Sequence, residues 1–215
     1  IRKIIKFKNN IIPIKTGIYE KNTILNYYLS TVPTSSSFIN YEKDLKPVKQ
    51  KVHTFSFIKN KYKIKKIDIL KIDVEGLELK IIKKILDFEL PLIIEVESNF
   101  KNSVFGDTFT SLHNFLSKKY FLETGFPTYL EDKSKFNSHL KPFRIGNYDT
   151  PSSRSPLYQM DCYYILRKKS YDLNDILLLI GYGFINEAKK NYLKIHKKLN
   201  KSQKENMASL FKILN

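Results

Sequence analysis

The chain has 215 residues, of which 42% are hydrophobic and 27% charged, and it contains one cysteine. This composition is typical of a globular protein with its own core, and it excludes a disordered tail, a collagen-like repeat and a disulfide-stabilised scaffold. No segment reaches the roughly 18 to 20 consecutive apolar residues that a membrane-spanning helix needs. We therefore expect a soluble, cytoplasmic protein.

The charge is strongly positive, with 38 basic and 21 acidic residues and a formal net charge of +17. Nearly all of the excess is lysine, since 34 of the basic residues are Lys and only four are Arg. Readout of bases and phosphates favours the planar guanidinium of arginine. We interpret most of the excess as codon bias in an AT-rich genome and predict no nucleic-acid partner, although a lysine-driven nucleic-acid binder is an alternative.

The first part of the chain, residues 11–57, consists of short apolar runs with a period of two, separated by polar turns. This pattern predicts β-strands and a hairpin. Residues 51–57 are rich in β-branched and aromatic side chains, and they predict one further short strand that ends at Phe57.

The middle of the chain predicts a βαβ unit. Residues 64–73 form an apolar run that ends in polar residues, and Leu79, Ile82 and Leu86 follow at helical spacing. Residues 92–96 then form a second apolar run. A strand, a helix and a strand in this order predict two parallel strands joined by a right-handed connection.

The rest of the chain predicts a helix that begins near Asp107 and Thr108, strands at 120–124 and 160–168, and a long connecting loop at 125–158. From residue 170 onward the apolar spacing is helical, and a capping box is expected at Ser202 and Glu205. The expected organisation is a domain at 1–169 and a helical appendage at 170–215. The lysine-rich faces of these helices are most simply solvated, and docking to a membrane, RNA or a protein partner is the alternative.

Acidic residues gather where the two strands of the βαβ unit end. Asp73 and Glu75 follow the first strand, and Glu95 and Glu97 lie in and after the second. Ligands of open α/β sheets bind outside the carboxyl ends of the strands, which makes these carboxylates candidate functional residues. Gly76 allows the chain to turn closely over that edge.

At these residues the sequence resembles the FkbM-type family of S-adenosylmethionine-dependent methyltransferases. The resemblance is carried by Leu70-Lys71-Ile72-Asp73-Val74-Glu75-Gly76, by Glu78 and by Ile94-Glu95, and it extends over about residues 11–168, including the loop at Ser35-Ser36-Ser37-Phe38 and a last strand that begins with Asp161. It implies a Rossmann-like class I methyltransferase sheet, S-adenosylmethionine as methyl donor, and O-methylation of a hydroxyl group on a sugar or another small metabolite.

The resemblance also implies roles for single residues. Asp73 and Glu75 are the expected catalytic carboxylates, one to orient the donor and one to accept the proton of the attacking hydroxyl, with the order left open. Asp73, Gly76 and Ser36 are expected to contact the donor. Glu95 and Glu97 are expected on the acceptor side, and Arg144, in the long loop, could meet an anionic acceptor. The four histidines lack metal-ligand spacing, so we expect no metal site.

The expected glycine-rich turn of such enzymes has no counterpart before Gly76, because Gly17 is the only glycine there. We therefore expect that the chain begins after the first βαβ unit of the family. The strand before Asp73 would then have an exposed edge. The alternative function is a methyltransferase-like domain that lacks a donor site and acts as a protein-binding module, and whether this chain alone is active is left open.

Overall fold

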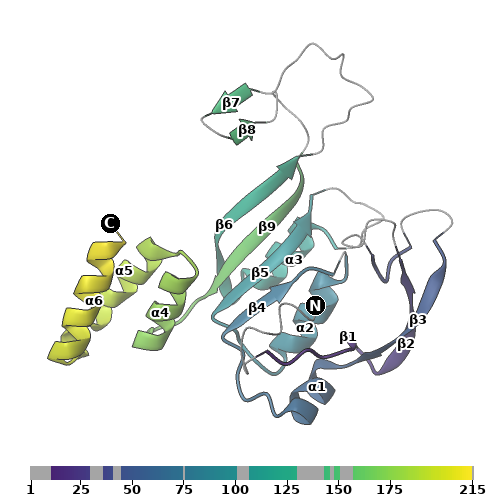
Figure 1. Cartoon of the computed structure of the whole chain (residues 1–215), viewed down its shortest axis with the longest axis horizontal. Coiled ribbons are helices and arrows are strands. Elements are labelled where there is room, and N and C mark those ends of the chain that lie inside the picture. Colours follow the sequence, from purple (N-terminus) through teal and green to yellow (C-terminus); the bar gives the residue numbers. More distant parts are fainter. Residues whose placement is uncertain are drawn as a thin grey trace. The chain divides into compact units, whose positions relative to one another are not determined.

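The computed structural model describes residues 11–29, 36–40, 45–74, 76–100, 107–129, 143–145, 148–150 and 157–214, with the backbone alone at 127–129, 143–145, 148–150 and 157–159. It divides the chain into two compact units, Ile1–Leu166 and Arg167–Asn215. Figure 1 labels the elements of both units.

A small three-stranded sheet forms the first part of unit 1. Its strands are β1 (Gly17–Ile18), β2 (Thr23–Tyr28) and β3 (Pro47–His53), in the order β1-β3-β2. β2 and β3 are antiparallel, and β1 is parallel to β3.

The prediction of a strand over residues 51–57 is wrong for its second half, which is helical. Thr54 accepts a hydrogen bond from the N–H of Phe57 and caps helix α1 (Phe55–Tyr62). Threonine is a favoured N-cap because its hydroxyl satisfies an N–H that the helix leaves free. Burial of Phe55 and Ile58 then stabilises the helical conformation over an extended one.

The main sheet of unit 1 contains β4 (Ile69–Ile72), β5 (Ile93–Asn99), β9 (Leu157–Leu166) and β6 (Tyr120–Tyr129), in the order β4-β5-β9-β6. β4 and β5 are parallel, and β9 is antiparallel to both of its neighbours. Helix α2 (Glu78–Leu86) joins the parallel pair, which confirms the predicted βαβ unit. In the described part of the chain, β4 is an edge strand of this sheet.

The core of unit 1 lies between the main sheet and two helices, α2 and α3 (Phe109–Leu116) (Figure 1). Side chains alternate between the two faces of a strand, so every second residue of the sheet meets these helices. The buried residues on this face are Ile72, Ile94, Val96, Cys162 and Tyr164, and α2 contributes Leu79, Ile82, Ile85 and Leu86. His113 of α3 lies 3.1 Å from the hydroxyl of Tyr164 through its Nδ1 atom.

The long loop predicted between residues 125 and 158 is partly strand. β6 continues to Tyr129 and β9 begins at Leu157, so that the two pair over nearly their whole length with two register shifts. Between them lie β7 (Phe143–Ile145) and β8 (Tyr148–Thr150), which form an antiparallel pair. The turn residues and prolines of this segment concealed the strands, because they interrupt the period-two pattern on which a strand prediction depends.

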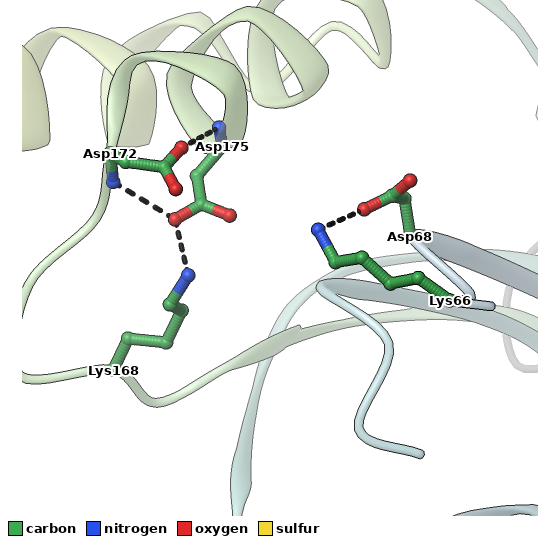
Figure 2. A network of polar contacts seen from close by, with 5 residues as sticks. All are labelled: Lys66, Asp68, Lys168, Asp172 and Asp175. Atoms are coloured by element: carbon green, nitrogen blue, oxygen red, sulfur yellow. Dashed lines mark hydrogen bonds and ion pairs between the residues drawn. The ribbon is translucent and has the colours of Figure 1, made fainter.

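Unit 2 consists of α4 (Leu173–Gly181), α5 (Ile185–Ile195), a short 3₁₀ helix η2 (His196–Lys198) and α6 (Lys201–Ile213). α4 begins with a capping box between Asp172 and Asp175, and Figure 2 shows Lys168 bound to Asp175 in the same network. Lys66 and Asp68 form a separate ion pair within unit 1. The rings of Tyr192 and Phe211, tilted by 55° with centroids 5.3 Å apart, join α5 to α6.

The capping box predicted at Ser202 and Glu205 is two residues out of place. In α6 the Asn200 side chain accepts from the N–H of Gln203, and the Gln203 side chain accepts from the N–H of Asn200. The side chains of Asn200 and Gln203 each provide an acceptor oxygen, as those of Ser202 and Glu205 would. With the helix beginning at Lys201, its apolar residues Met207 and Phe211 are buried.

Candidate functional site at the end of strand β4

The chain turns sharply after β4, where the acidic motif lies. Asp73 is exposed just past the end of the strand, and Gly76 is buried with a φ angle of 105°. An L-amino acid with a Cβ atom rarely adopts such an angle, which explains why glycine stands here. Glu75, between them, lies outside the described residues, so its predicted catalytic role stays a prediction.

Glu78 holds this turn in place from the first turn of α2. The backbone N–H of Gly76 donates to both carboxylate oxygens of Glu78, at 2.9 and 3.0 Å, and the N–H of Val74 donates to Oε1 at 3.1 Å. The Glu78 side chain is buried, with the residue only 4% exposed. It therefore satisfies N–H groups of the turn that would otherwise be buried without partners.

Burial raises the pKa of Glu78, while the N–H donors of Gly76 and Val74 act to lower it, and the charge of nearby Asp107 adds to the rise. A carboxylate at the first turn of a helix also faces the positive end of the helix dipole. The turn and the beginning of α2 are thus connected through one buried acidic side chain.

The sheet face opposite α2 and α3 carries a polar cluster, which we call the Lys71 cluster: Lys71, Glu95, Asp161 and Tyr163. Lys71 and Glu95 are register partners on β4 and β5 and form an ion pair. Glu95 is in turn the register partner of Tyr163 on β9. Three strands thereby bring together residues from three separate parts of the sequence.

The pKa values show that the Lys71 cluster is electrostatically connected to Asp73. Burial raises the pKa of Asp161; the charge of Lys71 lowers it, whereas Glu95 and Asp73 raise it further. Burial also raises the pKa of Tyr163, and the nearby carboxylates add to this rise. The hydrogen bond to Glu95 raises the pKa of Lys71. One lysine therefore compensates several carboxylates on this face.

Two cavities adjoin the turn after β4. One, of about 300 Å³, is lined by Asp73 and Val74 together with Gly17 and Phe38. The other, of about 480 Å³, is lined by Gly76 and Lys80, and it shares Phe38 with the first. The segment around Ser36 is thus close to the acidic motif, because Phe38 borders both cavities.

The predicted site residues lie in different environments. Ser36 is half-buried and its carbonyl accepts from the Tyr27 hydroxyl at 3.3 Å. Glu97 lies inside β5 and not after it, since the strand continues to Asn99. Arg144 is in β7, whose backbone alone is described. Asp73 and Gly76 lie in the turn after β4, whereas Glu95 lies within β5 as the register partner of Lys71.

Sequence reasoning gave no role to three residues that the structure places at or near the turn. Glu78 belongs to the quoted motif, but only its contacts reveal that it holds the turn. Asp161 was seen as the start of a strand, and its alternation with Tyr163 is the signal that put both on one face. Asp107 was expected with Thr108 at the start of α3, and Thr108 is the residue that caps the helix. One Asp107 carboxylate oxygen is buried with no hydrogen-bond partner among the described residues.

Two kinds of feature are absent from the described ranges. No group of three or more His, Cys, Asp or Glu residues there is arranged to hold a metal ion. In the same part of the chain, no helix has the length and apolar character needed to cross a membrane.

The model of the methyltransferase FkbM domain matches residues 9–126, just over half of the chain. This chain belongs to the FkbM methyltransferase domain family. The matched range contains β4, the turn at Gly76, α2 and β5, while β9 and all of unit 2 follow it. No curated protein and no solved structure gives a significant match. The family assignment makes the chain a methyltransferase domain, and its acidic motif is the natural candidate for the functional site.

Proposed function

We propose that the domain takes part in methyl transfer from S-adenosylmethionine to a hydroxyl group of a sugar or another small hydroxylated metabolite. The observation that carries this proposal is the turn after β4, where Asp73 is exposed beside a cavity and Glu78 fixes the backbone behind it. A Rossmann-like arrangement is supported by the parallel β4 and β5 with their helical connection. When bound, the sulfonium supplies an electrophilic methyl group for an in-line displacement.

The residues of the turn fit this task. An exposed carboxylate that lines a cavity can accept hydrogen bonds from an ammonium or hydroxyl group, or accept the proton of an attacking hydroxyl. Methyl transfer depends chiefly on holding the two reactants in line, so a rigid turn contributes directly to the rate. We assign Asp73 and Glu75 to these roles, with Gly76 and Ser36 as donor contacts.

The acceptor side is assigned to Glu97 and Arg144, together with Glu95. Lys71 occupies Glu95 in an ion pair, and the Glu95 side chain is only 12% exposed against 60% for Lys71. We therefore propose that Glu95 shapes the acceptor side through Lys71 and not by direct contact alone. Such a pair keeps a carboxylate charged in a half-buried position.

The test begins with binding of S-adenosylmethionine to the full chain, measured by titration calorimetry. Transfer of a radiolabelled methyl group to a panel of methyl glycosides then follows. We expect Asp73→Asn to abolish transfer with an unchanged circular dichroism spectrum, because the side chain is exposed and its loss leaves the core intact. Asp87→Asn, an exposed carboxylate at the other end of α2, is the matched control and should remain active.

The outcomes separate the proposed function from its alternative. A folded protein that takes up no S-adenosylmethionine would favour the protein-binding module, and full activity of Asp73→Asn would remove the assignment of the site. Binding of the donor without transfer to any glycoside would limit the failure to the acceptor class.

A further inference from the structure

A stretch of unit 2, residues 188–204, is unusually rich in lysine, and we call it the basic run. It contains seven lysines in seventeen residues and no aspartate or glutamate, whereas the whole chain has 34 lysines in 215 residues. A uniform codon bias would place two or three lysines in a stretch of this length. The density in the basic run is more than twice that value, so composition alone does not account for it.

The structure places the lysines of the basic run on the outside of unit 2. The run covers most of α5, the short helix η2 and the first turn of α6. Ala188, Asn191, Tyr192 and Ile195 form its buried stripe. Five of its seven lysines are exposed, namely Lys190, Lys194, Lys197, Lys198 and Lys201, and the other two, Lys189 and Lys204, are half-buried.

This arrangement is electrostatically unfavourable for the isolated protein. Lys190 and Lys194 lie four residues apart on α5, a spacing at which like charges on an α-helix repel. Lys201 and Lys204 lie in the first turn of α6, which has no acidic residue, although the positive end of the helix dipole favours anions there. These repulsions are relieved when an external anionic surface approaches.

Acidic residues of unit 2 compensate little of this charge. Lys190 pairs with Glu187 at 3.2 Å. Lys201 lies 4.0 Å from Glu205, but the two side chains are 92% and 65% exposed, so this pair contributes almost nothing. Lys194 donates to the neutral amide oxygen of Asn191.

An apolar side chain lies among these charges. Leu193, between Lys190 and Lys194 on α5, is 72% exposed. The run contains no arginine, and its one tyrosine, Tyr192, is buried, so it lacks the guanidinium and exposed aromatic groups that bind nucleic acid. Lysines around an exposed aliphatic side chain are instead typical of a helix that lies on a membrane surface.

We propose that the basic run docks unit 2 onto an anionic phospholipid surface, with the lysines facing lipid phosphates and Leu193 entering the headgroup region. This is a peripheral contact that goes beyond the proposed methyl transfer and does not depend on it. The negative charge of such a surface is spread over many lipid headgroups. Several lysine ammonium groups can therefore bind it without a fixed hydrogen-bond geometry.

Vesicle co-sedimentation of the full chain tests the proposal. The probes are large vesicles of phosphatidylcholine alone and vesicles with about one quarter phosphatidylserine, in about 0.1 M salt. The triple variant Lys194→Gln, Lys197→Gln, Lys198→Gln should bind the anionic vesicles about a hundredfold more weakly, since each lysine near such a surface contributes roughly fivefold. Leu193→Ser should weaken binding further without changing its dependence on salt.

The matched control removes the same charge elsewhere. Lys15, Lys46 and Lys65 are exposed and scattered in unit 1, and their replacement by glutamine should change vesicle binding by less than about threefold. Equal losses in the two triple variants would show that only net charge matters and would overturn the proposal. Absence of binding to anionic vesicles would overturn it too, as would binding of the basic run to oligouridylate with no binding to vesicles.

Discussion

The Glu78 carboxylate accepts the backbone N–H of Gly76 with both of its oxygens, at 2.9 and 3.0 Å. The two residues are only two positions apart, and the contact fixes the turn that carries Asp73. Because Glu78 is also the first residue of α2, the turn and the helix form one structural piece. A change at either residue should therefore affect the turn more than the rest of the domain.

Glu78→Gln should loosen the turn. An amide side chain keeps one acceptor oxygen but places an NH₂ donor where Oε2 now accepts from the N–H of Gly76. Two donors then face each other in a buried turn, at a cost of about 1–3 kcal/mol in the free energy of unfolding. The amide hydrogens of Val74 and Gly76 should exchange faster in the variant, as followed by NMR. Lys80→Gln, on the exposed side of the same helix, should leave exchange at these two amides unchanged. Equal exchange in all three proteins would mean that Glu78 does not hold the turn.

Gly76→Ala should destabilise the domain by at least about 1–2 kcal/mol, because a Cβ atom is strained at the positive φ angle of this residue. Gly181→Ala is the control, since a Cβ atom there meets nothing within 4 Å and alanine favours the end of α4. In urea unfolding, the free energy of unfolding of Gly181→Ala should be equal to or higher than that of the wild type. An equally stable Gly76→Ala protein would contradict the strain argument.

Lys71→Met should raise the pKa of Asp161, because the lysine charge now lowers it against the effects of burial, Glu95 and Asp73. Titration of the side-chain carboxyl carbons by NMR measures this directly. Lys66→Met removes an equal charge from the exposed ion pair with Asp68, and it should leave the pKa of Asp161 unchanged. If the pKa of Asp161 were the same in Lys71→Met as in the wild type, the charge of Lys71 would not act on Asp161.

The domain should lose stability at alkaline pH. Burial raises the pKa of Cys162 from 9.0 to about 12, and it raises the pKa of Tyr171 from 10.0 to about 12. Groups with a raised pKa in the folded state stabilise fully below their unfolded pKa and lose that contribution as the pH rises toward the folded value. The free energy of unfolding should therefore fall between about pH 9 and 12.

Cys162→Ala isolates the contribution of the thiol. Between pH 9 and 10, where the unfolded thiol ionises before most tyrosines do, the variant should show a smaller loss of stability than the wild type. The Cys162 thiol should also resist a thiol reagent near pH 8 until the protein is unfolded, because it is buried and protonated. Rapid labelling of the folded protein would contradict this assignment.

The βαβ unit and its acidic end could be predicted from the sequence because they are local. The apolar runs around Leu70 and Ile94 and the helical spacing between them are contained in about thirty consecutive residues. The helix at Phe55 was missed, since its aromatic residues favour a strand on their own and the cap at Thr54 decides the outcome. The strands at Phe143 and Tyr148 were missed because each has only three residues, too few to show a period of two.

The sequence by itself determined the positively charged composition, the parallel strand pair, the position of Asp73 beyond its strand and the need for glycine at position 76. Only the tertiary structure decided that Asp161 and Tyr163 join Lys71 and Glu95, because an antiparallel strand inserted beside β5 has no local signature of its partner. The tertiary structure also decided that the buried Glu78 side chain accepts hydrogen bonds from Val74 and Gly76 in the turn before its helix. Hydrogen bonds and ion pairs between distant strands depend on register and burial, which a linear pattern does not contain.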